Sequence, residues 1–484
     1  MSRASHRSQA IARQMLSTSA QLSPEAPVLF QSSGALRSYQ LNRPDKLNTL
    51  NSQLIALLRH KVEEWSTSDL CGTIAGTGTG RAFCAGGDVA SIIQQITTPA
   101  TRHKALDFFK HEFELDFILA SLPKPYVVIL DGYTMGGGAG LAANAPFRVA
   151  TERTEFAMPE TKIGYSPDVG STHFLSRLDG ELGTYLALTS DVLRGRAVYE
   201  HGFATHFIPS RRIPTLLERL TALESPHPSV IDRVIEELSS EREPDDDPAP
   251  FTGKRRMALD YAFRHTKIEN IVDDLKSFSN HGDTSVRIWA QNTLAMLEMR
   301  SPTSLKVALN AIRKGRELTL LEALEMELQI ATAYCNGASS DFLTGVTAVL
   351  LDKVKGRPQW SPDSIEQVTD EVVSRFFDPK SPYLASTPKL TIPEHLRSGP
   401  SIHPMKYALP TEEEIRAVVR GAHSSGGTTG ITVDELVSRF EQLRNGKMGV
   451  GEKVLEVAQR RCQTVDNADG NFVWLKWDNV RARP

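Results

Sequence analysis

The stretch that decides the expected fold is Tyr126-Val-Val-Ile-Leu-Asp-Gly-Tyr-Thr-Met-Gly-Gly-Gly-Ala-Gly140. It starts with a short apolar run that is typical of a buried β-strand, and the turn Asp131-Gly132 ends that run. The glycine run Gly136 to Gly138 follows, and glycine lets a backbone N–H approach a ligand because no Cβ stands in the way. A tight turn or close helix packing would also explain such a run.

Strand-like and helical segments alternate on both sides of this stretch. Short β-like runs occupy residues 28–30, 73–75 and 147–150. Between the first two, the apolar side chains of residues 54–65 share one face of a predicted helix. Alternation of this kind indicates an α/β fold.

The composition is that of a soluble globular protein that does not cross a membrane. Of 484 residues, 40% are hydrophobic and 23% are charged, and no apolar run approaches the length of a transmembrane helix. A chain of this length is expected to hold one main domain with appended parts. The formal net charge of -3 gives no global reason to expect nucleic-acid binding, although it does not exclude a local basic patch.

The cysteines are predicted to be reduced thiols, and the N-terminus indicates a mitochondrial location. Cys71, Cys84, Cys335 and Cys462 form no CxxC pair and match no histidine at zinc spacing, so neither a zinc site nor a disulfide framework is expected. Residues 1–24 contain several arginines, many serines and no acidic residue, which is the composition of a mitochondrial transit peptide. An ordinary disordered N-terminus can have the same composition.

Residues 25–375 are predicted to form the main domain. Within it, helices are expected over 174–188 and 303–334, and the acidic, proline-rich stretch 239–250 is expected to be an exposed loop. A functional acidic segment is the alternative interpretation of that stretch.

A linker and a small appended helical module are predicted after the main domain. The linker, residues 376–410, is rich in Pro and Ser. The module, residues 411–484, has helices that begin at the capping-box patterns Thr411-x-x-Glu414 and Thr432-x-x-Glu435. The Gly/Ser/Thr stretch 423–430 between them is predicted to be flexible.

Two further segments carry residues suited to acyl chemistry. Arg81-Ala-Phe-Cys-Ala-Gly-Gly-Asp88 is a second glycine segment, and N–H donors from the two glycine segments could converge on one oxygen as an oxyanion hole. Glu160 and Asp168 are separated by a turn that contains Gly164 and Pro167, so they could face each other. As alternatives, Glu160 could pair with a nearby lysine and Asp168 could cap the following helix.

Three neighbouring patterns are weaker candidates. Gly76-Thr-Gly-Thr-Gly80 lacks the glycine spacing of a dinucleotide loop. Ser166 lacks the second glycine of a nucleophile elbow. Cys84 has no evident basic partner, so it is predicted to be a packing residue.

Together these segments resemble the crotonase superfamily. Leu41-Asn-Arg-Pro-Asp-Lys-Leu-Asn48, the Phe-Cys-Ala-Gly-Gly-Asp segment, the Gly136 to Gly138 run and Phe156 to Glu160 occur in the order of that superfamily. Within it the chain is most similar to the 3-hydroxyisobutyryl-CoA hydrolases, over about residues 28–360. The segments that carry this closer similarity are Ala157-Met-Pro-Glu-Thr161, Pro167-Asp-Val-Gly170, Ser301-Pro-Thr-Ser-Leu305 and Val349-Leu-Leu-Asp-Lys353.

The resemblance implies a fold and a set of roles. The fold is a ClpP-like spiral of ββα units followed by a helical region. By position, the N–H groups of Gly87 and Gly137 match the oxyanion-hole pair, Glu112 matches a substrate-contacting glutamate, and Glu160 and Asp168 match the catalytic pair. CoA is part of the substrate, so neither a separate cofactor nor a metal is implied. The implied reaction is hydrolysis of 3-hydroxyisobutyryl-CoA in the mitochondrial matrix, a step of valine catabolism.

Several positions depart from related enzymes. Enoyl-CoA hydratases carry their first catalytic glutamate where this chain has Gly140, so hydration is not expected. Residues 170–174 replace a more glycine-rich stretch, and Thr344 and Thr347 stand where an acidic residue and an arginine are usual. These changes bear on the choice of acyl group.

A structural role is the alternative from a different class. Relatives of this hydrolase serve as proteins of the mitochondrial small ribosomal subunit, and the appended module would suit such a role. A homo-oligomer is also compatible with the resemblance.

Overall fold

The computed structural model describes residues 26–224, 227–242, 246, 248–400, 402–422, 430–466 and 473–478. The predicted transit peptide, 1–24, and nearly all of the predicted flexible stretch, 423–430, lie outside these residues. Part of the predicted acidic loop, at 243–245 and 247, also lies outside them.

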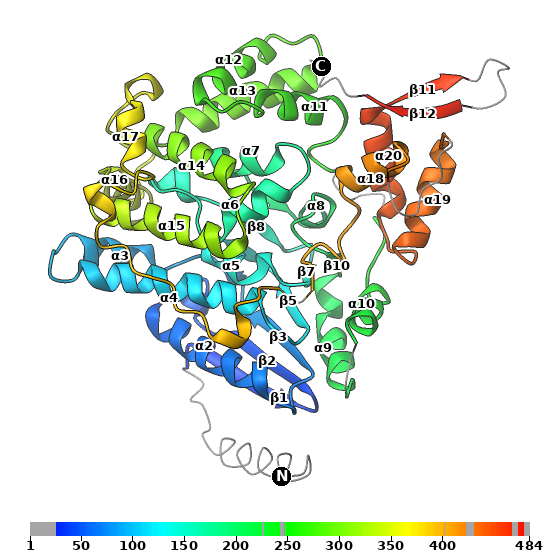
Figure 1. Ribbon diagram of the computed structural model, residues 1–484, viewed down its shortest axis with the longest axis horizontal. Coiled ribbons are helices and arrows are strands. Elements are labelled where there is room, and N and C mark those ends of the chain that lie inside the picture. The colour runs from blue at the N-terminus through cyan, green and yellow to red at the C-terminus, as the bar shows by residue number, and fades with distance from the viewer. Residues whose placement is uncertain are drawn as a thin grey trace.

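The main sheet has six strands in the order β1-β2-β3-β5-β7-β10 (Figure 1). β1 pairs antiparallel with β2, and the remaining pairs are parallel. β5 and β7 are buried along their whole length, and apart from Arg148 in β7 their side chains are apolar or aromatic, as expected for parallel strands covered on both faces. The strands are β1 (Val28–Ser33), β2 (Leu36–Leu41), β3 (Thr73–Gly78), β5 (Tyr126–Leu130), β7 (Phe147–Ala150) and β10 (His206–Phe207).

A second sheet of four short strands stands beside the first. β4 (Ala82–Cys84), β6 (Tyr133–Met135) and β8 (Glu155–Ala157) pair in parallel, and β9 (Leu193–Arg194) pairs antiparallel with β8. Each of the first three follows a strand of the main sheet directly in sequence, so the chain winds through repeated turns of two strands and a helical segment. This is the expected spiral of ββα units.

Helices cover both faces of the main sheet. On one face, Val127 and Ile129 pack with the apolar side chains of α9 (Ile213–Thr221) and α10 (Pro228–Glu236). The other face belongs to the main core, which includes α2 (Ser52–Thr67) and α4 (Arg102–Ala120). The helix predicted over 54–65 is α2, capped at its start by the Asn51 side chain.

The later part of the main domain is helical, as predicted, but both long helices are interrupted. The run expected over 303–334 is α14 (Pro302–Gly315) and α15 (Leu320–Cys335), the second starting at a Thr319/Glu322 capping box. The run expected over 174–188 is broken before α7 (Leu182–Thr189) by Gly180, which has a φ of 57°. The other helices are α3 (Val89–Ile96), α5 (Gly137–Ala143), α6 (Ser171–Phe174), α8 (Arg196–Glu200), α11 (Gly253–Ala262), α12 (Ile268–Phe278), α13 (Thr284–Glu298), α16 (Asp341–Val346) and α17 (Asp370–Ser374).

The segment predicted as a linker is packed against the main domain near its middle and near its end. Near its middle the Thr391 N–H donates to Glu114 on α4, at 2.6 Å. Further on, buried Arg148 donates to the Pro404 carbonyl at 2.9 Å, and Tyr407 stacks on Phe147. The described part of this segment is therefore ordered chain that joins the main domain to the module.

The module contains the two predicted helices and more. α18 (Glu412–Val419) and α19 (Val433–Leu443) both begin at the predicted capping boxes. They are followed by α20 (Val450–Arg461) and by the hairpin of β11 (Cys462–Asp466) and β12 (Val473–Trp477), which extends away from the body in Figure 1. No sequence pattern described above predicts this hairpin.

Ion pairs dock the module on the main domain. Asp179 accepts from the Lys453 ammonium at 2.7 Å and from the Glu412 N–H at 2.8 Å. Asp260 lies 3.4 Å from Arg461 and 3.7 Å from Arg460. Because Asp260 and Arg460 are almost fully buried, this contact is a fixed part of the fold.

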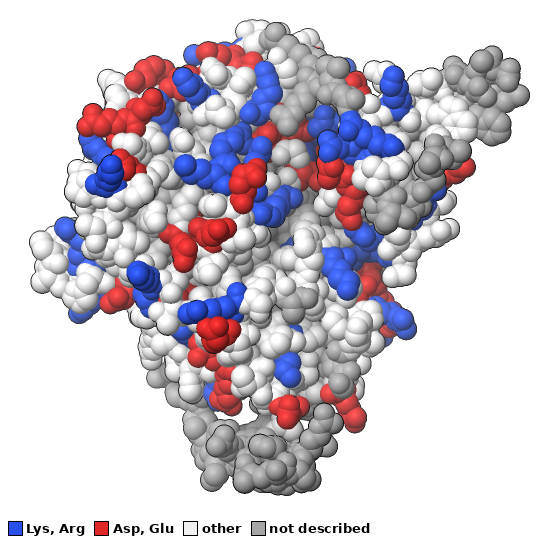
Figure 2. Space-filling view, in the orientation of Figure 1, with Lys and Arg blue, Asp and Glu red and all other residues white. Residues whose placement is uncertain are grey.

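The surface shows no large region of a single charge on the face drawn in Figure 2, where basic and acidic side chains lie intermingled. Among the described residues, no helix is both long and apolar enough to span a bilayer.

Candidate active site

Three parallel strand ends define the candidate active site. β4, β6 and β8 pair in parallel, so their carboxyl ends meet at one edge of the second sheet. Gly87 lies shortly after β4, Gly137 shortly after β6, and Glu160 shortly after β8. The fold thereby gathers three predicted site residues from distant parts of the sequence.

Gly87 and Gly137 each present an unpaired backbone N–H. The backbone of Leu50 holds the loop that contains Gly87. The Leu50 N–H donates to the Gly86 carbonyl and the Leu50 carbonyl accepts from the Asp88 N–H, both at 2.8 Å. Gly137 is the first residue of α5, where an N–H has no partner within the helix. Within the described residues neither N–H has an acceptor, so both are available to a ligand oxygen.

Glu112 lies against both glycines. A Cβ on Gly87 would be 3.7 Å from Glu112 Oε1, and a Cβ on Gly137 would collide with the same atom. The Glu112 side chain is almost fully buried, and its Oε1 has no hydrogen-bond partner among the described residues. The predicted substrate-contacting glutamate therefore lies beside the predicted oxyanion hole.

Glu160 and Asp168 complete the group. A Cβ on Gly136 would be 2.8 Å from Glu160 Oε1, which places Glu160 beside the glycine run. Asp168 follows a short loop and precedes Val169, whose φ of 56° is unusual for a β-branched residue. Both carboxyl groups are buried, Glu160 with 6% and Asp168 with 7% of its surface exposed. Strained backbone of this kind is often found at functional sites.

Burial raises the pKa of every carboxyl group in this cluster. For Asp168 it raises the pKa to about 7, although the nearby Tyr165 hydroxyl favours the anion without making a regular hydrogen bond. The pKa of Glu160 is raised well above its usual value by burial and then by repulsion from Asp168. The pKa of Glu112 is raised by burial and by repulsion from Asp168 and Glu160. Asp168, with its pKa raised to about 7, can exchange protons near neutral pH, as acid–base catalysis requires.

Glu327 holds the loop that carries Asp168. This buried side chain on α15 accepts hydrogen bonds from the Gly170 N–H at 2.6 Å, the Thr172 N–H at 2.9 Å and the Thr172 hydroxyl at 2.7 Å. Burial raises its pKa to about 8 in spite of these donors. Glu327 lies more than 150 positions from the loop in sequence, so no local pattern could have revealed it.

The space beside Gly140 is filled, which explains why the hydratase glutamate has no counterpart. A Cβ on Gly140 would be 2.5 Å from Val169 Cβ and 2.8 Å from Asp116 Oδ2. A glutamate at this position would require Val169 and Asp116 to move. The predicted exclusion of hydration thus has a steric basis.

The weaker sequence candidates have packing roles. A Cβ on Gly76 would collide with the Tyr39 ring, so this glycine makes room for a core side chain. Burial raises the pKa of Cys84 to about 12, which makes the thiol a poor nucleophile. Thr344 and Thr347 lie on α16 and at the start of the following π-helical turn, and α16 packs against α3 and the Glu160 turn.

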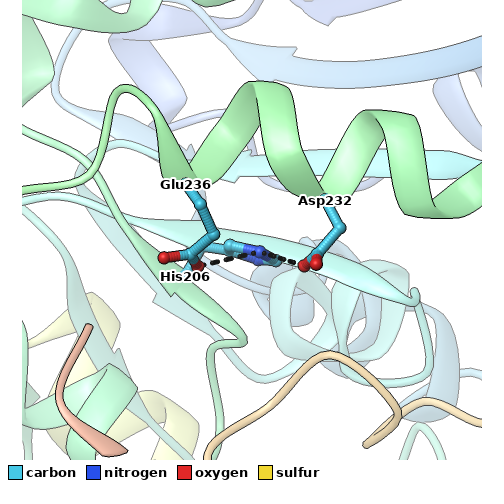
Figure 3. Close-up of side chains that lie close together, drawn as sticks. All are labelled: His206, Asp232 and Glu236. Atoms are coloured by element: carbon cyan, nitrogen blue, oxygen red, sulfur yellow. Dashed lines mark hydrogen bonds and ion pairs between the residues drawn. The ribbon is translucent and has the colours of Figure 1, made fainter. Parts of the chain in front are cut away.

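A single group of side chains in the described residues has the composition of a metal site. His206, Asp232 and Glu236 converge between β10 and α10 (Figure 3). His206 Nε2 is 3.0 Å from Asp232 and 3.3 Å from Glu236. However, the ammonium of Lys447 from the module contacts the same Glu236 oxygen. An ammonium group of the chain already pairs with one of its carboxylates, so we interpret it as a docking contact of the module.

A substitution at Glu327 tests its hold on the catalytic loop. In Glu327→Gln one amide N–H₂ would face an N–H donor, so at least one of the three hydrogen bonds is lost. We expect kcat for a 3-hydroxyacyl-CoA thioester to fall about tenfold, since a lost buried hydrogen bond costs about 1–3 kcal/mol. KM should change little, because the Gly87 loop is untouched.

The matched control is Glu325→Gln, an exposed position on the same helix. An unchanged kcat in Glu327→Gln, with both variants equally folded by circular dichroism, would contradict this role.

Comparisons with known proteins show the family of the chain. Residues 36–377 match the model of the enoyl-CoA hydratase/isomerase family. The chain is 38% identical to the mitochondrial 3-hydroxyisobutyryl-CoA hydrolase of Gallus gallus, over 76% of this chain and 92% of that protein. It is 39% identical to the small ribosomal subunit protein mS47 of Neurospora crassa, over 90% of this chain and 85% of that protein.

Among solved structures, a carnitinyl-CoA dehydratase from Mycobacterium thermoresistibile superposes with a TM-score of 0.65 and 30% identity. The match covers 74% of this chain and 98% of that one. The names of the hydrolase relatives confirm the predicted mitochondrial location. The chain belongs to the enoyl-CoA hydratase/isomerase family of the crotonase superfamily, and within it is related to the 3-hydroxyisobutyryl-CoA hydrolases.

Proposed function

We propose that the protein hydrolyses the thioester of 3-hydroxyisobutyryl-CoA to 3-hydroxyisobutyrate and CoA in the mitochondrial matrix. The observation that carries this proposal is the convergence of Glu160 and Asp168 with two unpaired N–H donors. The filled space beside Gly140 supports hydrolysis over hydration. Membership of the family supports an acyl-CoA thioester as the substrate class.

The two glycine N–H groups act on the thioester carbonyl. Attack at the carbonyl carbon moves negative charge to its oxygen, and two fixed donors stabilise that charge better than the neutral ground state. Loss of one such donor typically costs about 10²–10³ in rate. The collapse of the adduct breaks the C–S bond, and the departing CoA thiolate takes up a proton.

Glu160 and Asp168 supply the nucleophile or base and manage the protons. Glu160 either attacks the carbonyl carbon itself, giving a mixed anhydride that water then hydrolyses to release the acid and restore the carboxylate, or removes a proton from the attacking water. Asp168 positions water, binds the substrate hydroxyl or transfers the proton to the leaving thiolate. Glu112, beside both glycines, would then contact the acyl group.

Isosteric variants of the pair test the mechanism. In Glu160→Gln and Asp168→Asn the side chains keep their size and lose their basicity. We expect kcat to fall about 10²–10⁴-fold in each, as for loss of an acid–base group. The measurement is thiol release from (S)-3-hydroxyisobutyryl-CoA, with acetyl-CoA and crotonyl-CoA as comparison substrates.

The control is Glu155→Gln, which removes a carboxylate that pairs with Arg194. No thiol release by the wild-type protein, or full turnover by a Glu160→Gln/Asp168→Asn double variant, would disprove the proposed function.

We propose as a second function that the module attaches the protein to the mitochondrial small ribosomal subunit. The alignment with the Neurospora crassa ribosomal protein covers 90% of the chain, a share that residues 1–410 cannot supply alone. The hydrolase of Gallus gallus covers 76%. Leu443, Leu455 and Val465 are exposed apolar side chains of the module, as expected for a region that meets a partner.

Charged substitutions on the module test this attachment in the full chain. In Leu443→Glu/Leu455→Glu the exposed positions tolerate a charge, so the fold is kept while an apolar contact would be lost. We expect the wild type to co-sediment with mitochondrial small subunits and the double variant to be released.

The matched control is Ile288→Glu, an exposed apolar position on α13 of the main domain. Absence of the wild type from the subunit fraction would rule out this second function.

A further inference from the structure

Asp116 is a buried carboxyl group next to the proposed catalytic pair, and no sequence pattern singled it out. Asp116 lies one helical turn beyond Glu112 on α4, so both side chains project from the same face. Only 3% of its surface is exposed. Neither of its two carboxyl oxygens has a hydrogen-bond partner among the described residues.

The groups that face Asp116 offer it no positive charge. They are the carboxyl groups of Glu112, Asp168 and Glu327, the hydroxyls of Tyr39 and Tyr126, and the Cys84 thiol. The non-ionisable neighbour is Gly140, whose Cβ position is 2.8 Å from Asp116 Oδ2. Asp116 therefore lies between α5 and the loop that carries Asp168, next to the carboxyl groups of the site.

Glu114 on the same helix is also buried but, unlike Asp116, has ion-pair partners. Its fully buried side chain pairs with Arg59, with Lys110 at 2.6 Å and with the Thr391 N–H at 2.6 Å. The two positions differ by two residues, so they face different sides of α4. The fold thus supplies counter-charges for one buried acid of α4 and supplies none for the other.

An ionised carboxylate without partners is very costly inside a protein, and the group keeps its proton instead. We propose that Asp116 is a positioning residue of the hydrolytic site and that it remains protonated there. It acts through Asp168, because a protonated Asp116 fills the space beside Asp168 with a polar group that carries no negative charge. The kinetic part of this inference rests on the proposed thioesterase function, whereas the protonation of Asp116 does not.

The protonation has a defined effect on stability. Burial and then repulsion from Glu112 raise the pKa of Asp116 well above its usual value of about 4. Between the unfolded and the folded pKa, the native protein keeps a proton that the unfolded chain releases. The free energy of unfolding contributed by this group therefore falls as pH rises through that interval. An asparagine, which does not titrate, removes this loss.

The experiment compares thermal unfolding of the wild type and Asp116→Asn from pH 5 to pH 9 in the full chain. We expect the Tm of the variant relative to wild type to rise steadily with pH. The matched control is Glu114→Gln, which should lie below wild type at neutral and alkaline pH because it removes two ion pairs. A relative Tm of Asp116→Asn that is constant or falls with pH would overturn the proposal.

A spectroscopic measurement covers the case in which Asp116→Asn folds poorly. A protonated carboxyl group has a carbonyl stretch separate from that of a carboxylate, and infrared spectra of the wild type and Asp116→Ser at neutral pH would reveal it. We expect the difference spectrum to contain a protonated-carboxyl band. A carboxylate band in its place would overturn the proposal.

The kinetic arm tests the positioning role. Ionisation of Asp116 at alkaline pH would put a new negative charge near the thioester oxygen and oppose the charge that develops there. In Asp116→Asn the alkaline limb of kcat/KM should move upward by about one pH unit or more. Superimposable profiles would overturn the positioning role, and absence of turnover by the wild type would disprove the proposed function while leaving the thermal result valid.

Discussion

The parallel pairing of β4, β6 and β8 is the constraint on which the site depends. Each strand has three residues, yet their shared direction brings the Gly87 loop, the start of α5 and the Glu160 turn to one edge. The main sheet holds this small sheet in place, because each short strand follows a long buried strand of the spiral. Loss of the pairing would separate the two N–H donors from the carboxyl groups.

The electrostatics of the site follow from the lack of ion-pair partners for its five buried carboxyl groups. Glu112, Asp116, Glu160, Asp168 and Glu327 are all buried, and no ion pair of the described residues involves any of them. Because of burial and mutual repulsion, the five carboxyl groups are not all ionised at the same time at neutral pH, so protons are shared within the group. A site of this kind gives up stability in exchange for groups that can gain and lose protons during the reaction.

The module adds a second constraint at a distance from the chemistry. Asp179 and Asp260 of the main domain meet Lys453, Arg460 and Arg461 of α20 in a mostly buried contact. Lys447 of the module also contacts Glu236 of the His206 group. The residues in these contacts are not among those at the carboxyl ends of β4, β6 and β8.

The sequence predicted the long elements and the order of the site motifs. The strands Tyr126–Leu130 and Phe147–Ala150 were predicted to the residue because both are short, mostly apolar runs, with Arg148 as the one charged residue among them. β4, β6 and β8 were not predicted, since three residues are too few for a periodic pattern. The break at Gly180 was missed because apolar periodicity continues across it. The break between α14 and α15 was missed although the stretch Gly315-Arg-Glu-Leu-Thr319 is mostly polar.

For the site, the glycine segments and the resemblance placed Gly87, Gly137, Glu112, Glu160 and Asp168 as candidates, and the structure brings them together. Their individual roles stay predictions. Asp116 shares a helix face with Glu112, but its lack of a partner is a tertiary property that spacing does not reveal. Glu327 was not accessible to sequence reasoning because a distant helix brings it to the loop.

The most direct test of the account is the pH dependence of kcat/KM for thiol release from (S)-3-hydroxyisobutyryl-CoA by the wild-type protein. Glu160 must be ionised to act as nucleophile or base, and burial raises its pKa well above the usual value, so activity is predicted to rise with pH above about pH 5. Activity that stays constant from pH 8 down to about pH 5, near the ordinary pKa of a carboxyl group, would contradict the account.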